Sequence, residues 1–224
     1  MKKNTTVNKN LFNRLFYTTK ENKNLIIGIL SICFVIFLCF QIFNFYNSNK
    51  IKKNSISFFK LYNLDELSVV EESILKLSKE NNFYAILSKI ELIELNFENK
   101  NYEYVINLYK ELLNDKYLNK IYKSAIASKA SYQFININFL DLSIDYTDQI
   151  KNFVSFIDDE LINYQTVKME LNYLIKILEL QTKNIDYVNS NEVINFYNQI
   201  INSEYSSTAL KERVTKIHEF FYYK

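Results

Sequence analysis

The 22 residues from Leu25 to Tyr46 contain no charged side chain and are mostly apolar. As an α-helix rising about 1.5 Å per residue, they extend roughly 33 Å, enough to cross a hydrocarbon core about 30 Å thick. Lysines flank the stretch on both sides. This pattern predicts a single transmembrane helix over residues 25–46, which anchors whatever domain follows it.

Two kinds of targeting signal contain a similar apolar run. A cleaved signal peptide has a shorter apolar run, about 7–15 residues, and small residues at its cleavage site. Here the run is longer and bulky residues precede the polar Asn47. A lipoprotein signal places a small residue before the acylated cysteine, whereas Ile32 precedes Cys33 and Leu38 precedes Cys39. We therefore expect an uncleaved anchor rather than either signal or a buried core helix.

The charges of the chain divide at this anchor. Residues 1–53 hold nine of the 27 Lys and Arg residues and one of the 25 Asp and Glu residues, a net charge of +8, which leaves −6 for residues 54–224. Six basic residues precede the anchor and four follow it closely. This bias predicts a cytoplasmic basic tail over residues 1–24 and a domain outside the cytoplasm. An acidic domain also argues against nucleic-acid binding.

The chain lacks the residues that make tight turns. Proline is absent, and the single glycine, Gly28, lies within the anchor. Hairpin turns and sheet corners depend on these residues, so their absence predicts an all-α fold.

Apolar residues at helical spacing mark the individual elements. They predict helices over residues 65–80, 82–98, 102–114, 119–138, 158–182 and 191–203, with shorter, less regular helical structure over 140–157 and a loop over 184–190. A last helix follows, capped by Ser206, Ser207 or Thr208. We expect residues 47–64 to form a membrane-proximal helix or linker and residues 65–224 to form the helical domain. The acidic run at residues 158–160 is expected at a helix start.

Three of these helices share an apolar spacing of four residues and then three. The triplets are Val70, Ile74, Leu77; Val105, Tyr109, Leu112; and Val193, Tyr197, Ile200. The first two are 35 residues apart, close to the tetratricopeptide period of about 34 residues. Ala125, Ser128 and Ala130 predict a helix-packing seam, because small side chains allow close approach. An ordinary helical bundle with accidental periodicity is the alternative.

Side chains suited to catalysis or metal binding are scarce. His218 is the only histidine, and both cysteines lie in the anchor. The densest acidic cluster, at residues 158–160, would place adjacent carboxylates on different faces of a helix. We therefore expect no enzyme activity, no metal or other cofactor, and no small-molecule substrate.

Almost the whole chain resembles the YfgM-type proteins. The resemblance rests on a short basic N-terminus, one span, a helix leaving the membrane, and degenerate repeats. Its best segments are FYAILSKIELIELNFENKNYEYVINLYKELL at residues 83–113 and residues 164–217, which end in SSTALKERVTKI. In the family the first segment reads as a helix, a Gly-Asp turn and a helix of the form Tyr-x-x-Ala-x-x-x-Tyr. This chain keeps Tyr102 and Tyr109 but has Val105 for the alanine and Lys100 in the turn.

The resemblance implies a binding function. YfgM-type proteins are ancillary subunits of the bacterial SecYEG translocon, and they link emerging chains to periplasmic chaperones. It implies one transmembrane helix followed by a degenerate tetratricopeptide-like α-solenoid, in the bacterial inner membrane with the C-terminal domain in the periplasm. The domain's negative charge would favour basic or unfolded partner segments. Another envelope-assembly scaffold, for example in cytochrome maturation, shares this architecture and stays open.

Overall fold

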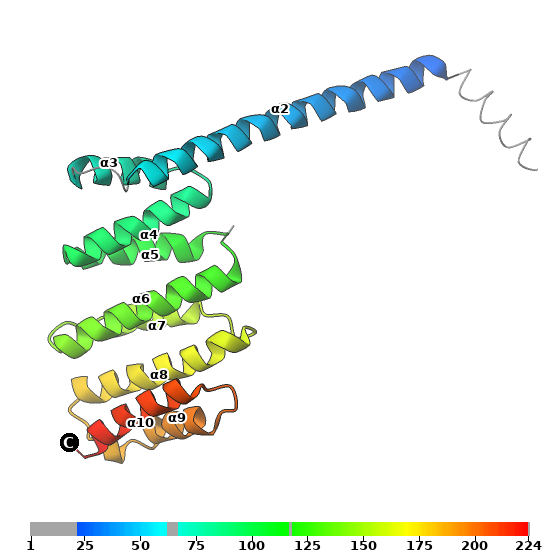
Figure 1. Cartoon of the computed structure of the whole chain (residues 1–224). Helices are drawn as coiled ribbons and strands as arrows, with labels where there is room; N and C mark the ends of the chain where they lie inside the picture. The colour runs from blue at the N-terminus through cyan, green and yellow to red at the C-terminus, as the bar shows by residue number, and fades with distance from the viewer. Residues whose placement is uncertain (1–21, 62–66, 117, 224) are drawn as a thin grey trace, which may run out of the picture. The chain divides into compact units, whose positions relative to one another are not determined.

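The computed structural model describes residues 22–61, 67–116 and 118–223, and all regular structure in these ranges is helical (Figure 1). The elements are α2 (Lys23–Leu61), α3 (Leu67–Ser78), α4 (Phe83–Glu98), α5 (Tyr102–Asn114), α6 (Lys120–Leu140), α7 (Thr147–Ser155), α8 (Ile162–Thr182), the 3₁₀ turn η1 (Tyr187–Asn189), α9 (Asn191–Asn202) and α10 (Thr208–Tyr222). The prediction of an all-α fold is confirmed. Most of the expected basic tail, residues 1–21, lies outside the described residues, as do residues 62–66.

The described residues separate into two compact units. The anchor unit comprises residues 22–61, 67–73 and 80–84, and the helical unit comprises residues 74–79, 85–116 and 118–223.

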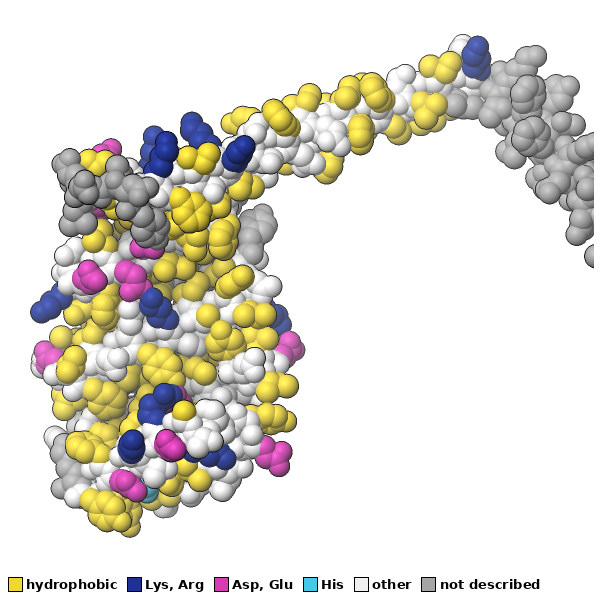
Figure 2. Space-filling model, in the orientation of Figure 1, with side chains coloured by type: hydrophobic (Ala, Val, Ile, Leu, Met, Phe, Trp, Pro, Cys, Tyr) yellow, Lys and Arg dark blue, Asp and Glu magenta, His cyan; other side chains and the backbone are white. Residues whose placement is uncertain are grey.

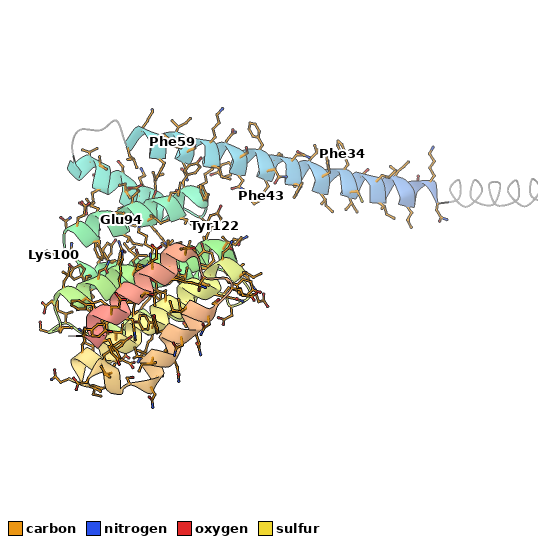
Figure 3. All side chains as sticks on the ribbon, turned by 60° about the horizontal axis from the view of Figure 1, so that its bottom comes forward. Phe34, Phe43, Phe59, Glu94, Lys100 and Tyr122 are labelled. Carbon is orange, nitrogen blue, oxygen red and sulfur yellow. The ribbon has the colours of Figure 1, made fainter. Side chains whose placement is uncertain are left out.

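Helix α2 dominates the anchor unit. It runs without interruption for 39 residues, so the apolar stretch and residues 47–61 form one helix. Among the described helices, α2 alone is long and apolar enough to cross a membrane, and none of its most apolar window is buried. Its apolar side chains lie exposed between basic residues, as Figure 2 shows, and Phe34 and Phe43 project from it in Figure 3. An exposed surface of this kind is unfavourable in water and favourable in lipid.

The end of α2 is held by aromatic and ionic contacts within the anchor unit. The rings of Phe58 and Phe59 lie 6.0 and 6.4 Å from the ring of Tyr84. More than two turns earlier in the helix, Lys50 forms a 2.7 Å ion pair with Glu80. These contacts fix the short segment at residues 80–84 against the part of α2 that follows the apolar stretch.

In the helical unit, from α5 onward, each helix packs against one or more of the helices that follow it. Helix α5 contacts α6 and α7, α6 contacts α7 and α8, and α8 contacts α9, which contacts α10. Figure 1 shows them stacked in approximate chain order. The core consists of fully buried aromatic and aliphatic side chains, among them Phe134, Phe153 and Leu171.

Two helices end in turns for which glycine is the usual residue. After α4, the N–H of Asn101 donates to the carbonyl of Asn96 (2.9 Å) and that of Lys100 to the carbonyl of Phe97 (3.0 Å). This is the Schellman pattern, and Lys100 occupies its left-handed position with φ of 60°. The end of α8 repeats the pattern, with Asn184 at φ of 50°. The chain therefore reverses direction at these points without glycine.

The spacing of the helices is not constant. Helices α4, α6, α8 and α10 begin at residues 83, 120, 162 and 208, so successive starts are 37, 42 and 46 residues apart. The 35-residue offset between the first two triplets is not maintained farther along the chain, because α6 and α8 have 21 residues each.

The start of α8 differs from the prediction. The helix begins at Ile162 rather than at residue 158. The acidic run instead forms a turn in which Asp158 and Glu160 bind the ammonium of Lys120, at 2.9 and 3.1 Å. The main-chain N–H of Glu160 also donates to the carboxylate of Asp158 (2.9 Å), which competes with helix formation.

Replacing Lys100 with glycine is expected to raise the free energy of unfolding by about 0.5–1 kcal/mol, because the left-handed conformation is strained for a residue with a Cβ. The urea midpoint of the full chain in nanodiscs, followed by circular dichroism, measures this change. Asn99, whose φ is negative, provides the matched control, and Asn99→Gly should lower the midpoint. Equal shifts from the two glycines would contradict the assignment.

Candidate functional site

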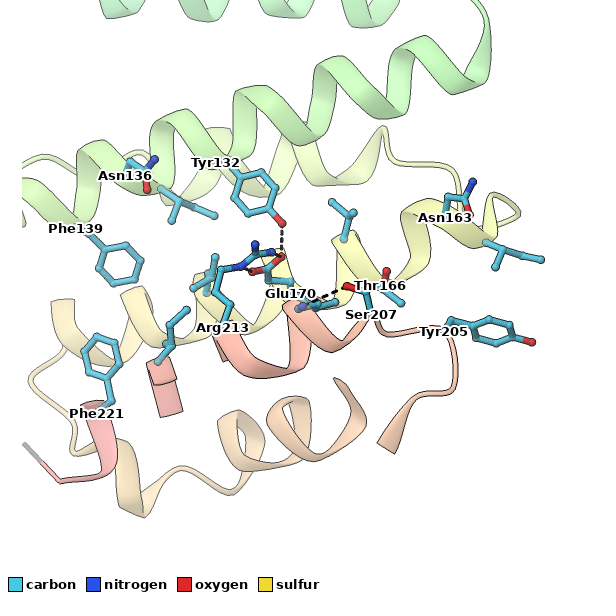
Figure 4. Close-up of a pocket in the computed structure, with 16 residues that line it drawn as sticks. Tyr132, Asn136, Phe139, Asn163, Thr166, Glu170, Tyr205, Ser207, Arg213 and Phe221 are labelled. Atoms are coloured by element: carbon cyan, nitrogen blue, oxygen red, sulfur yellow. Dashed lines mark hydrogen bonds and ion pairs between the residues drawn. The ribbon is translucent and has the colours of Figure 1, made fainter. Parts of the chain in front are cut away.

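A groove in the helical unit has walls from α6 and α10 and a floor from α8 (Figure 4). Its volume is about 1080 Å³. Thr166, Glu170 and Leu174 form the floor, since residues four apart lie on one face of a helix. The walls follow the same periodicity, with Tyr132, Ile135, Asn136 and Phe139 on α6 and Leu210, Arg213, Ile217 and Phe221 on α10.

Glu170 is the centre of this groove. Its side chain is 2% exposed, although it is a carboxylate. Arg213 binds it with two parallel hydrogen bonds, from Nε to Oε1 and from Nη2 to Oε2, both 2.6 Å. The hydroxyl of Tyr132 donates to Oε2 (2.5 Å). Three helices therefore meet at one carboxylate.

The electrostatics of this triad favour the ion pair. The hydrogen bonds to Glu170 raise the pKa of Arg213, which stays charged. Burial, followed by the nearby Glu170 carboxylate, raises the pKa of Tyr132, so its hydroxyl stays protonated and can donate. A buried carboxylate is costly unless it is paired and hydrogen-bonded, and both oxygens of Glu170 meet that condition.

The ends of the groove differ in character. At one end Phe139 and Phe221 place their rings 6.4 Å apart. At the other end Ile162, Asn163 and Tyr205 are exposed to solvent. The groove is therefore closed by aromatic rings at one end and open at the other.

A second polar cluster lies between α10 and the helices α8, η1 and α9. The hydroxyls of Tyr173 and Tyr187 are 2.8 Å apart, and that of Tyr187 is 2.7 Å from Nδ1 of His218. The ring of Tyr197 stacks on the imidazole at 3.9 Å. Burial lowers the pKa of His218, although Glu219 on the same helix acts in the opposite direction. This cluster ties α10 to α8, η1 and α9.

The residues of the three predicted triplets occupy mostly buried positions. Those that are buried are Ile74, Leu77, Val105, Tyr109, Leu112, Val193 and Ile200, while Val70 and Tyr197 are half-buried. Tyr109 donates a hydrogen bond to Gln133 on α6 (2.5 Å) and places its ring 5.7 Å from that of Phe153 on α7.

Of the three small residues of α6 that were predicted to form a helix-packing seam, one is not buried. Ser128 and Ala130 are buried, but Ala125 is exposed. The buried small face includes Ser124 and Ala127 instead, because adjacent residues of a helix lie about 100° apart. The N–H of Asp158 donates to the hydroxyl of Ser124 (3.1 Å), which brings the turn before α8 close to this face.

None of the groove residues was predicted as a site from the sequence. Tyr132, Glu170 and Arg213 lie on three helices, far apart along the chain, and no local motif joins them. One compositional signal exists, because Arg14 and Arg213 are the only arginines among 27 basic residues. In a chain that otherwise uses lysine, an arginine marks a position where the planar two-pronged donor matters.

Comparisons with protein-family models, with curated proteins and with solved structures found no match. Among the residues that the structure describes, no group of three or more His, Cys, Asp or Glu side chains is placed to hold a metal ion.

Arg213→Lys is expected to lower the free energy of unfolding by about 1–2 kcal/mol, because one ammonium cannot reproduce both hydrogen bonds to Glu170. Arg213→Met should cost more, since it leaves a buried carboxylate unpaired. Urea unfolding of the full chain in nanodiscs gives the values. Lys216, an exposed residue of the same helix, is the control, and Lys216→Met should change the stability by less than about 0.5 kcal/mol.

His218 should make the fold sensitive to mild acid. Its folded pKa lies below the unfolded value, so the unfolded chain binds the proton more readily and stability falls as pH drops below about 6.5. The urea midpoint should therefore be lower at pH 5.5 than at pH 7.5. Because His218 is the only histidine, His218→Gln should flatten this dependence. An unchanged slope in the variant would show that another group is responsible.

Proposed function

We propose that this chain is a non-enzymatic, membrane-anchored protein-interaction module. The groove between α6, α8 and α10 is the observation that carries the proposal. It is large, mostly apolar and open to solvent at one end, which suits the binding of another molecule. Its only acid, Glu170, has both oxygens engaged by Arg213 and Tyr132, so it is poorly placed to act as a catalytic acid or base.

The anchor supports a location of this module at a membrane. The exposed apolar surface of α2 supports a single-pass helix, with residues 25–46 in the lipid. The excess of basic residues before the span supports a cytoplasmic N-terminus and a periplasmic helical domain in the bacterial inner membrane. Phe43, Phe45 and Tyr46 would then lie at the outer interface, where aromatic side chains are favoured.

The partner is proposed from the resemblance to YfgM-type proteins. On that basis the chain is an accessory subunit of the SecYEG translocon, which links translocating chains to periplasmic chaperones. The stacked helices of the helical unit support a degenerate tetratricopeptide-like solenoid, a fold that offers concave binding surfaces. The span itself is then expected to contact the translocon.

Exchanging residues 25–46 for an unrelated transmembrane sequence of equal length tests this assignment. Crosslinking of the tagged full chain in intact membranes should recover translocon subunits, and the exchanged chain should recover them several-fold less while staying in the membrane fraction. Equal recovery would show that the span serves for location only. Recovery of other complexes alone, by both chains, would favour a different envelope-assembly scaffold.

A further inference from the structure

The charge of the groove limits what can enter it. Among its lining residues Glu170 and Arg213 are the only charged ones, and they are bound to each other. The lining is therefore electrically neutral. A charged side chain that entered would lose hydration without meeting an unpaired opposite charge, which is unfavourable. The groove thus selects an uncharged occupant.

The apolar lining selects side chains of the same kind. Ile135, Val167 and Leu174 lie along the inside of the groove, and Phe139 and Phe221 close one end. Burying aliphatic or aromatic side chains against them gains about 25 cal/mol per Å² of apolar surface.

The remaining polar groups are suited to a polypeptide main chain. Asn136 on α6 and Asn163 on α8 are exposed amides, each able to donate and accept hydrogen bonds. Arg213 uses Nε and Nη2 on Glu170, so Nη1 is not part of that pair. In a helical occupant the main-chain N–H and C=O groups are already hydrogen-bonded to each other. The hydrocarbon part of an acyl chain has no hydrogen-bonding groups for these side chains to bind. An extended segment leaves N–H and C=O groups that these side chains can bind.

The length of the floor sets the size of the segment. From Ile162 to Leu174 the helix rises about 18 Å, at about 1.5 Å per residue. An extended chain covers this distance with about five or six residues, at about 3.3 Å each.

We propose that the groove binds an extended segment of another polypeptide, five or six residues long, rich in aliphatic and aromatic side chains and free of charge. This inference rests on the proposed interaction function and names the chemistry of its partner. Because residues 54–224 carry a net charge of −6, basic residues on either side of the bound segment are favourable. The preferred partner segment is therefore uncharged where it lies in the groove and basic on either side of it.

A fluorescent peptide tests the proposal on the purified full chain in nanodiscs. The probe has six central residues that alternate Leu, Phe or Val with Ser or Thr, and two lysines at each end. Fluorescence anisotropy should show saturable binding. Replacing the central Phe with Lys, and separately with Glu, should weaken binding at least tenfold. Equal affinity for the charged peptides would overturn the proposal.

Protein variants locate the binding site. Asn136→Ala and Asn163→Ala alter exposed side chains and should each weaken binding about three- to tenfold without changing the urea midpoint. Asn202→Ala, an exposed asparagine on α9 outside the groove, is the matched control and should bind normally. Unchanged binding in both groove variants would place the peptide elsewhere. Saturable binding of a fluorescent fatty acid that the peptide does not displace would assign the groove to lipid.

This experiment contains no translocon. Peptide binding without crosslinking to the translocon would leave the groove's chemistry intact and reject the proposed partner. Crosslinking to the translocon without peptide binding would support the proposed partner and reject the proposed chemistry of the groove.

Discussion

One buried carboxylate, that of Glu170, joins α6, α8 and α10. Glu170 is removed from water, and its hydration is replaced by two hydrogen bonds from Arg213 and one from Tyr132. Helices α6 and α10 are therefore joined through a polar contact over the floor of α8, with Phe139 against Phe221 farther along. A polar bridge of this kind joins two walls without filling the space between them, so a hollow remains beside the triad.

The anchor imposes a separate constraint. Helix α2 exposes apolar side chains that are compatible with lipid, and it continues as helix for 15 residues beyond Tyr46, a rise of about 22 Å. A helix that continues beyond its apolar stretch without a break needs no glycine or proline, and the chain has neither in that segment. The proposed function follows from joining these two parts: a module held at a membrane and a groove that accepts a polypeptide segment.

Local patterns in the sequence predicted the helices well and the groove not at all. Residues 102–114 were predicted and observed with the same bounds, because their apolar face repeats regularly and Asn-rich turns flank it. The predicted start of α8 was wrong because the side chain of Asp158 binds a main-chain N–H that a helix would use. Ala125 was predicted to be a packing residue, but it lies on the exposed face of α6. The Glu170 triad joins residues 38 and 43 positions apart, and only tertiary packing brings them together.

In the proposed function, the groove of the anchored chain holds a segment of another polypeptide. Photocrosslinking in growing cells tests it most directly, with a photoreactive amino acid at position 136 in the groove or at position 212, exposed on α10 outside the lining. We expect position 136 to crosslink to newly made, pulse-labelled polypeptides and position 212 not to do so. Crosslinks of equal yield from both positions, or products from position 136 that contain only lipid, would contradict it.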